Sequence, residues 1–306
     1  MPYPTFRIAL LARALAIPAH AAPLPAPTTG IYALPDNQAK VSASLTVTPR
    51  AKNAPLGTRV LDVAMVALGS TRPITRYEVE LSKQMHLIAV SDDLRTFLHA
   101  HGERPGADGH FGIPVVFPRG GGWHVYADAV PAGLGQQVMR FDVNFDDAGA
   151  PPAAKPVTLQ PTGLTGSDGR YSVKFDALDL RAGQESQLTL HLLRDEKPAP
   201  DLAPFLGVVA HAVFIDASDL TYIHAHAAPV ASGGTAMRHG PTGKAGFSMA
   251  GMDMSPMDGP PLRPGTKVSP DLMLHVRAAK AGTYLLWLQF SAGGRVRTVP
   301  FVVSVA

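Results

Sequence analysis

One internal repeat constrains the fold of this chain more than any other feature of its sequence. Residues 85–90 and 97–101 recur as residues 210–215 and 222–226, with a His-x12-His-x-His pattern in each copy. Every histidine of the first pattern lies 125 residues before its counterpart, as His86 and His211 show. Two copies of one structural unit are therefore predicted. The matched histidines are His86, His99 and His101 in the first copy and His211, His224 and His226 in the second.

The sequence around the repeat is typical of short β-strands. Stretches of four to eight residues alternate or are apolar throughout, and Gly, Pro, Asn and Asp separate them. No window of helical length keeps a period of about 3.6 residues for three turns. An all-β fold is predicted, with strands at residues 42–48, 59–66, 76–81, 85–90, 123–127, 138–143, 171–175, 187–193, 208–215, 272–277, 283–290 and 296–305.

The repeat and the strand spacing together favour two tandem antiparallel β-sandwich domains, of immunoglobulin-like or cupredoxin-like form. A closed barrel is the alternative. Residues Gly122 and Gly282 begin similar strands at an offset near 160 rather than 125, so the second copy carries an insertion. The predicted segments are a signal peptide (1–21), an extended leader (22–40), the first repeat (41–146), a linker (147–169) and the second repeat (170–306), with a Met- and His-rich insertion at 227–262.

The N-terminal residues predict export. Arg7 precedes an apolar stretch at residues 8–17, and Ala19-His20-Ala21 has the small-x-small form of a signal-peptidase site. A disordered tail of a cytoplasmic protein is the alternative. No later apolar run approaches the roughly 20 residues that cross a bilayer. The mature chain is therefore predicted to be soluble and not membrane-spanning, and in a Gram-negative cell it would be periplasmic.

Composition excludes several kinds of chemistry. The chain has no cysteine, which excludes disulfides, thiolate zinc sites, iron–sulfur clusters, cysteine nucleophiles and blue copper centres. Its 27 basic and 24 acidic residues give a net charge of +3 and are scattered, so a nucleic-acid partner is not predicted. The common catalytic and nucleotide-binding motifs are missing, and we expect no enzyme, with a metalloenzyme as the lesser alternative.

The paired histidines predict metal binding. In a strand, residues i and i+2 point to one face about 7 Å apart, so His99 and His101 can approach one ion, as can His224 and His226. An Asp-containing turn before each pair indicates a hairpin that returns the single histidine, His86 or His211, beside the pair. Three imidazoles with open coordination positions suit Cu(II), Zn(II) or Ni(II). The alternative is strand or core histidines that bind only water or backbone groups.

A methionine-rich tract lies in the insertion. Its segment is too rich in Gly, Pro and Ser to bury these side chains in a regular core. Thioether sulfur is a soft ligand that favours Cu(I) or Ag(I), which predicts a Cu(I)-collecting loop. An adaptable apolar patch for a partner protein and an insertion without a role are the alternatives. The candidate ligands are Met249, Met252, Met254 and Met257.

Two resemblances extend this interpretation. Residues 248–257 resemble the Met/Asp/His/Ser-rich tracts of periplasmic bacterial copper-resistance proteins and their multicopper oxidases, although Met254 stands where such tracts often have His. The two repeats are similar to a family of exported bacterial β-sandwich proteins with a Met-His-Leu strand, a Leu-His-x-His strand and a Gly-x-Tyr strand. The second resemblance covers nearly the whole mature chain and implies export, the sandwich fold and paired histidines.

The sequence thus predicts a periplasmic protein that binds copper, or another transition metal such as zinc, for capture, buffering or delivery. An envelope efflux or oxidase protein is the expected partner. The competing hypothesis is an interaction module, free of metal, that docks on envelope proteins through its tandem sandwiches.

Overall fold

A computed structural model describes residues 28–32, 39–48, 54–55, 57–80, 82–145, 159–230 and 261–306. Every regular element in these ranges is a β-strand, and every pairing between named strands is antiparallel. The predicted all-β, antiparallel class is therefore confirmed. None of the described segments forms a helix long and apolar enough to cross a membrane.

The N-terminal half forms two sheets around one core. One sheet has the order β1-β8-β7-β4-β5 and the other has the order β2-β3-β6. Apolar residues of both sheets, such as Leu61, Phe111 and Trp123, meet in a single buried cluster. The strands are β1 (Thr28–Tyr32), β2 (Val41–Thr48), β3 (Thr58–Ala67), β4 (Met85–Ser91), β5 (Phe97–Gly102), β6 (His110–Val116), β7 (Gly121–Ala129) and β8 (Gln137–Phe145).

The C-terminal half is one strongly curved sheet. Its main path runs β13-β17-β14-β15-β16-β11-β10-β9, while β18 pairs with β17 and β12 pairs with β11. Because β9 and β10 also contact β18, the sheet nearly closes on itself around a core that includes Phe175, Phe214 and Phe301. The strands are β9 (Thr165–Asp168), β10 (Tyr171–Phe175), β11 (Glu185–Arg194), β12 (Lys197–Pro198), β13 (Leu202–Ala203), β14 (Ala210–Asp216), β15 (Tyr222–Pro229), β16 (Asp271–Arg277), β17 (Gly282–Ala292) and β18 (Arg295–Val305).

Strand β4 is buried on both faces. Side chains alternate across a strand, so Met85, Leu87 and Ala89 point into the N-terminal core. Ile88 points the other way, into a third apolar cluster that contains residues of both halves. His86 shares the face of Ile88 and is 1% exposed. This double burial explains why the strand reads as a nearly continuous apolar run in the sequence.

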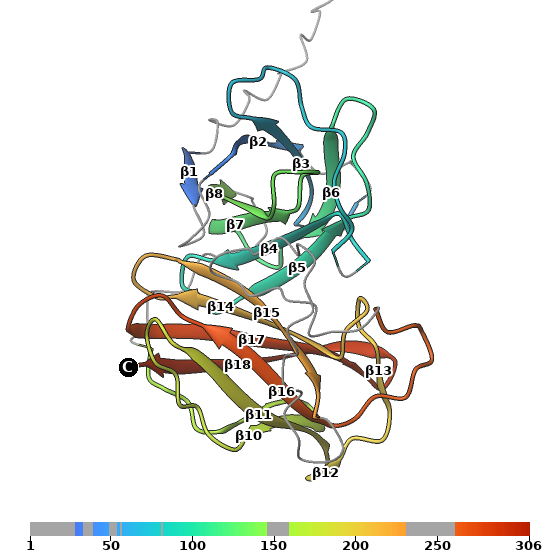
Figure 1. Cartoon of the computed structure of the whole chain (residues 1–306), viewed down its shortest axis with the longest axis vertical. Coiled ribbons are helices and arrows are strands. Elements are labelled where there is room, and N and C mark those ends of the chain that lie inside the picture. The colour runs from blue at the N-terminus through green and yellow to red at the C-terminus, as the bar shows by residue number, and fades with distance from the viewer. Residues whose placement is uncertain are drawn as a thin grey trace, which may run out of the picture.

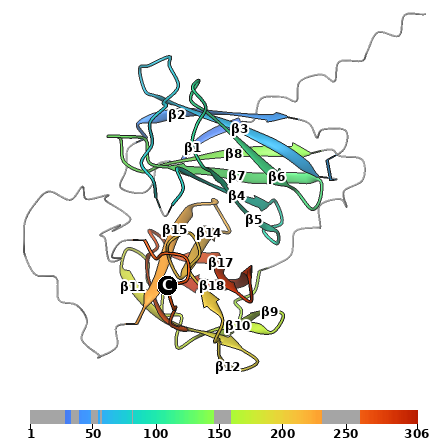
Figure 2. The same cartoon turned by 90° about the vertical axis from the view of Figure 1, so that its right-hand side faces the viewer.

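Strand β14 repeats this arrangement in the C-terminal half. Ala212 and Phe214 belong to the C-terminal core, whereas Val213 and Ile215 join the shared cluster. His211 therefore faces the same way as Val213, toward the N-terminal half. Figures 1 and 2 both show β4 and β5 lying against β14 and β15, so the two histidine-bearing hairpins meet where the halves contact each other.

Two reciprocal aromatic stacks fix this contact. The rings of Phe97 and Trp287 lie 5.1 Å apart at 19°, and those of Tyr126 and Tyr222 lie 5.0 Å apart at 18°. Each stack joins one residue from a histidine hairpin to one residue from β7 or β17 of the opposite half. The hydroxyl of Tyr126 also donates to the carbonyl of Leu220 at 2.8 Å. The interface is therefore self-complementary in the manner of a two-fold contact.

The hairpin turns contribute two leucines with strained backbones to the same interface, Leu94 buried and Leu220 partly buried. Leu94 and Leu220 have positive φ angles of 56° and 64°, a backbone region that costs a residue other than glycine roughly 1–3 kcal/mol. Leu94 belongs to the shared cluster and Leu220 packs against it. Burial of these side chains offsets the strain, so the turn conformation depends on the contact between the halves.

Some predicted boundaries differ from the structure. The strand expected at residues 76–81 is wrong, because Tyr77 and Glu80 form only isolated bridges to Pro131 and Lys83. Strand β6 was missed because Pro114 interrupts its pattern; the strand tolerates this proline because it lies at a sheet edge. Strands β1 and β9 lie within the intervals predicted as leader and linker, and β15 extends to residue 229, inside the predicted insertion.

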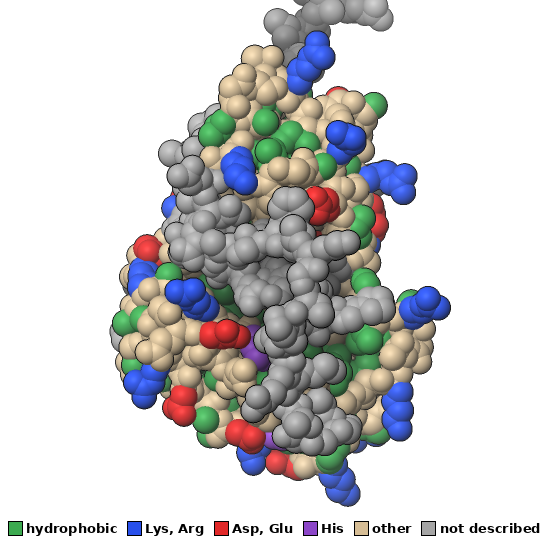
Figure 3. Space-filling model, viewed as in Figure 1, with side chains coloured by type: hydrophobic (Ala, Val, Ile, Leu, Met, Phe, Trp, Pro, Cys, Tyr) green, Lys and Arg blue, Asp and Glu red, His purple; other side chains and the backbone are tan. Residues whose placement is uncertain are grey.

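The outer surface carries no large region of one charge in the view of Figure 3. Lys and Arg side chains are interspersed with Asp and Glu around the face, and histidine is visible only as small areas. The interspersed charges in this view agree with the scattered charges of the sequence.

The interface stacks should contribute measurably to stability. Replacing Trp287 with alanine is expected to lower the free energy of unfolding by about 3–5 kcal/mol, because it empties a buried aromatic site. A double-mutant cycle with Phe97→Ala should give a coupling energy of about 0.5–1.5 kcal/mol. Chemical denaturation measures both quantities. Val79→Ala, at a side chain that is 63% exposed, should change stability by less than about 0.5 kcal/mol; a Trp287→Ala effect equally small would contradict this interface.

Candidate metal centre

Hairpin pairing brings the three histidines of each half onto one face. In the β4–β5 hairpin His86 lies opposite His101, with His99 two pairs further along opposite Ile88. The β14–β15 hairpin has the same register, with His211 opposite His226 and His224 opposite Val213. The antiparallel return of the single-histidine strand beside the paired-histidine strand, expected from the sequence, is thus present in both halves.

The two sets do not form separate sites. The rings of His86 and His224, from opposite halves, have centroids 5.2 Å apart, and those of His99 and His211 are 5.7 Å apart. The sequence suggested one site per repeat, because it does not reveal which faces of the halves pack together. Because the histidine faces are the packed faces, one group results, here called the histidine cluster: His86, His99, His101, His211, His224 and His226.

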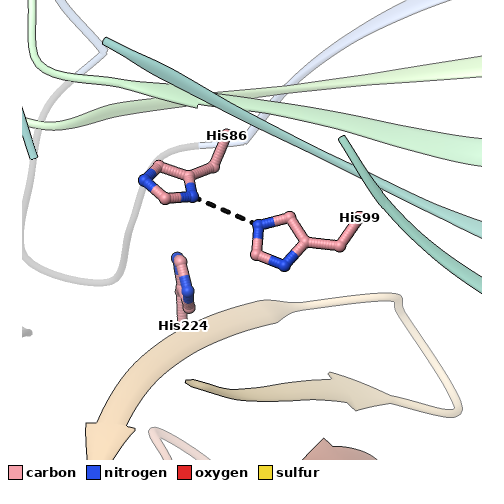
Figure 4. A group of neighbouring side chains, drawn as sticks. All are labelled: His86, His99 and His224. Atoms are coloured by element: carbon pink, nitrogen blue, oxygen red, sulfur yellow. Dashed lines mark hydrogen bonds between the residues drawn. The ribbon is translucent and has the colours of Figure 1, made fainter. Parts of the chain in front are cut away.

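Two overlapping sets of three nitrogens lie close enough to hold a metal ion. One set combines His86 and His99 with His224 of the opposite half; the other combines His211, His224 and His226. Within each set the ligand atoms all lie within 4.8 Å of one another. His224 belongs to both sets. Figure 4 shows its ring pointing across the interface toward His86 and His99.

Backbone carbonyls fix the tautomer of the two single histidines. Nε2 of His86 donates to the carbonyl of Glu80 at 3.3 Å, and Nε2 of His211 donates to the carbonyl of Phe205 at 3.1 Å. A carbonyl oxygen only accepts, so in both rings the proton is on Nε2 and Nδ1 keeps its lone pair. Nδ1 is the atom that faces the cluster. The accepting residues are also separated by 125 positions.

Side chains from the opposite half orient the next two rings. Nδ1 of His99 donates to Oε1 of Gln289 at 2.7 Å, and Nδ1 of His224 donates to Oδ2 of Asp128 at 3.4 Å. Asp128 lies beside His86 on β7, and Gln289 has the corresponding place on β17. Each half therefore supplies the hydrogen-bond acceptor that holds a histidine of the other half, with its Nε2 lone pair turned inward.

These outer hydrogen bonds leave lone pairs facing one another. Nδ1 of His86 lies 3.2 Å from Nε2 of His99, and Nδ1 of His211 lies 3.1 Å from Nε2 of His224. In these tautomers neither nitrogen of a pair carries a proton for the other, so a shared proton or a metal ion between them would relieve the contact of the two lone pairs. Two nitrogens on one ion, with bonds of about 2.0–2.1 Å, lie roughly 2.9–3.4 Å apart, and the observed separations fall in this range.

Burial disfavours the protonated form of most histidines in the cluster. Burial, with a smaller contribution from neighbouring histidines, lowers the pKa of His86 to about 4 and that of His101 to about 3. The same cause holds the pKa of His99, His211 and His226 well below the usual value. Imidazoles that are already unprotonated at neutral pH bind a metal without first losing a proton. Nε2 of His226 is buried and has no hydrogen-bond partner among the described residues, as expected for an open ligand atom.

Two acidic side chains lie at the cluster in different charge states. Burial raises the pKa of Asp128, but the hydrogen bond from His224, the positive charge of His224 and His86 when they are protonated, and the hydrogen bond from Gln136 outweigh it, so the net pKa is below the usual value and the group is ionised. Burial, reinforced by the charge of Asp128, raises the pKa of Glu80 to about 8, so this carboxyl is mostly protonated at pH 7. One buried negative charge therefore accompanies the histidines.

Neither Asp128 nor Gln289 was predicted from the sequence to take part in the site. Each is a single polar residue in the apolar part of its strand, and each is now seen to hold a histidine of the opposite half. Their separation of 161 positions matches the offset near 160 that relates Gly122 to Gly282. The sequence signal that could have identified these two residues is a polar residue at matched positions of two otherwise apolar strands.

The remaining predicted and unassigned residues are placed as follows. Met249, Met252, Met254 and Met257 lie outside the described residues. Among the described residues, the four histidines outside the cluster each contact a carboxylate, His110 with Asp62, His124 with Asp142, His191 with Asp271 and His275 with Glu185.

Comparison with known proteins adds little about activity. A family model described as a domain of unknown function (DUF8832) matches residues 165–306, which is the C-terminal half from the first residue of β9. No curated protein is similar enough to match this chain. The crystal structure of the S-layer protein SbsC domains 4 and 5 matches over 88% of this chain and 100% of that chain, with 11% identity and a TM-score of 0.20.

The lowered histidine pKa values predict acid sensitivity of the metal-free protein. An unfolded histidine binds a proton near pH 6.5, whereas folded His86 does so only near pH 4, so the unfolded state holds more protons between these values. Stability should therefore fall as the pH falls from 7 to 5, by about 2 kcal/mol for His86 alone. Urea unfolding with a chelator present, at both pH values, measures this loss. The loss should be smaller by that amount in His86→Gln; equal losses in the two proteins would contradict the burial argument.

Proposed function

We propose that this protein binds a transition metal, with copper as the favoured ion and zinc as the second candidate, for capture, buffering or delivery. The observation that carries the proposal is the facing of imidazole lone pairs across the contact between the two halves, in sets of three nitrogens within 4.8 Å. Imidazole nitrogen is a ligand that copper, zinc and nickel all accept. With three histidines and an open position, the site suits exchangeable binding.

The cluster is better suited to holding an ion than to a catalytic reaction. His86, His211 and His224 are at most 2% exposed, so a bound ion would be shielded from solvent on these sides. The ionisable group nearest to them by hydrogen bonding, Asp128, has a lowered pKa and is occupied by its donors. An ion shielded in this way favours storage or transfer, which is the role that we propose.

The remaining elements of the proposal come from the sequence. They are export to the periplasm, a pair of immunoglobulin-like or cupredoxin-like sandwiches related by the repeat, and an envelope efflux or oxidase protein as partner. The methionines of the insertion, Met249, Met252, Met254 and Met257, would collect Cu(I) and present it to the rest of the protein.

Metal titration of histidine variants tests the central claim. Metal-free full-length protein is titrated with Cu(II), Cu(I) and Zn(II), each against a competing chelator. Because His224 belongs to both nitrogen sets, His224→Ala should weaken binding by more than about 100-fold, which exceeds the usual effect of losing an outer partner. His101→Ala, outside both sets, provides a second variant with a smaller expected loss.

The matched control is His191→Ala. This histidine is also held by carboxylates, Asp176 and Asp271, but lies on the surface of the C-terminal half away from the cluster. Its replacement should leave metal affinity unchanged. The proposal would be overturned if the wild-type protein bound none of the three ions more tightly than the His224→Ala variant does. The interaction module would then be the better hypothesis.

A separate variant tests the methionine tract. Replacing Met249, Met252, Met254 and Met257 together with leucine keeps apolar bulk but removes the thioethers. We expect weaker Cu(I) binding and unchanged Cu(II) binding, because sulfur ligands prefer the softer ion. Competition assays for each oxidation state measure this difference, and unaltered Cu(I) affinity would exclude the tract as a ligand.

A further inference from the structure

Asp128 is a completely buried carboxylate whose direct partners are neutral side chains and one histidine. It accepts hydrogen bonds from Nε2 of Gln136 at 2.8 Å, from the hydroxyl of Tyr222 at 3.0 Å and from Nδ1 of His224 at 3.4 Å. No Lys or Arg pairs with it among the described residues. Its one ion-pair contact in the described part of the chain is with the ring of His224, so a positive charge on the cluster side of this ring, from a proton or from a bound metal ion, offsets the cost of burying the carboxylate.

The corresponding position in the other half has no charge. Gln289 occupies the place of Asp128 on its strand, accepts from His99, and donates from Nε2 to the hydroxyl of Thr298 at 2.9 Å. A neutral amide is therefore sufficient to orient a histidine of the cluster. The negative charge of Asp128 must serve another purpose, because orientation alone does not require it.

We propose that Asp128 is a positioning residue that makes the histidine cluster select a divalent ion, Cu(II) in the case of copper, over Cu(I). This inference rests on the proposed function and names the oxidation state that the cluster takes. When an ion occupies Nε2 of His224, the ring lies between the ion and the carboxylate. The carboxylate increases the electron donation of the ring and offsets the added charge.

The preference follows from charge and from ligand type. In an interior of low dielectric constant, a carboxylate interacts about twice as strongly with a doubly charged ion as with a singly charged ion at the same place. Imidazole suits Cu(II) and Zn(II), whereas Cu(I) gains more from soft sulfur ligands. Since His224 belongs to both nitrogen sets, Asp128 acts on whichever set holds the ion.

The reduction potential of bound copper tests this selection. Asp128→Asn keeps a hydrogen-bond acceptor for His224 but removes the charge. We expect Cu(II) affinity to fall 10–100-fold and Cu(I) affinity to change much less. The potential should then rise by about 60–120 mV, because a tenfold ratio corresponds to 59 mV for one electron. Full-length protein with one equivalent of copper is used, and circular dichroism monitors its fold.

A second variant gives the opposite prediction. Gln289→Glu adds a carboxylate beside His99, so the reduction potential of bound copper should fall. If Asp128→Asn does not fold, this second variant alone tests the role of the carboxylate charge. Asp142→Asn is the control, because Asp142 also accepts from a histidine, His124, but is 43% exposed and outside the cluster. It should leave the potential unchanged.

Two contrary results can be told apart. Wild-type protein that binds no copper overturns the proposed function, and the role of Asp128 with it. A different result is copper binding by the wild-type protein with the same reduction potential in wild type, Asp128→Asn and Gln289→Glu. That result overturns only the role of the carboxylate.

Discussion

The contact between the histidine-bearing faces of the two halves is the interaction on which the rest of the structure depends. Each half presents a hairpin whose outward face has an aromatic ring followed by two histidines, and the aromatic rings stack on Trp287 and Tyr126 of the opposite half. Without this packing the six imidazoles would lie on two exposed sheets. With it they form one buried group, and the halves share rather than duplicate their ligands.

Burial then determines the chemistry of the cluster. Removing imidazoles from water disfavours their protonated form, and outer acceptors take one N–H group of each of four rings, so lone pairs of these rings point inward. Facing lone pairs repel one another, and apolar side chains would pack better in such an interior. The proposed metal ion would account for this cost, because it would find imidazoles that are already oriented and held by both halves.

Sequence reasoning reached the local structure but not the assembly. The repeat, the antiparallel histidine hairpin and the shared face of His99 and His101 follow from the sequence pattern, and so do the positions of most strands. What the sequence could not provide was the orientation of one half against the other, which depends on long-range packing of residues such as Ile88 and Val213. For the same reason Asp128 and Gln289 went unnoticed, since each acts on a histidine about 100 or more positions away.

The X-ray absorption spectrum of the protein loaded with one equivalent of Cu(II) tests the central claim most directly. A centre in the histidine cluster predicts three or more nitrogen neighbours at about 2.0 Å, with the multiple-scattering pattern of imidazole rings. A spectrum with oxygen neighbours and no imidazole pattern, or with sulfur in the place of nitrogen, would contradict the account.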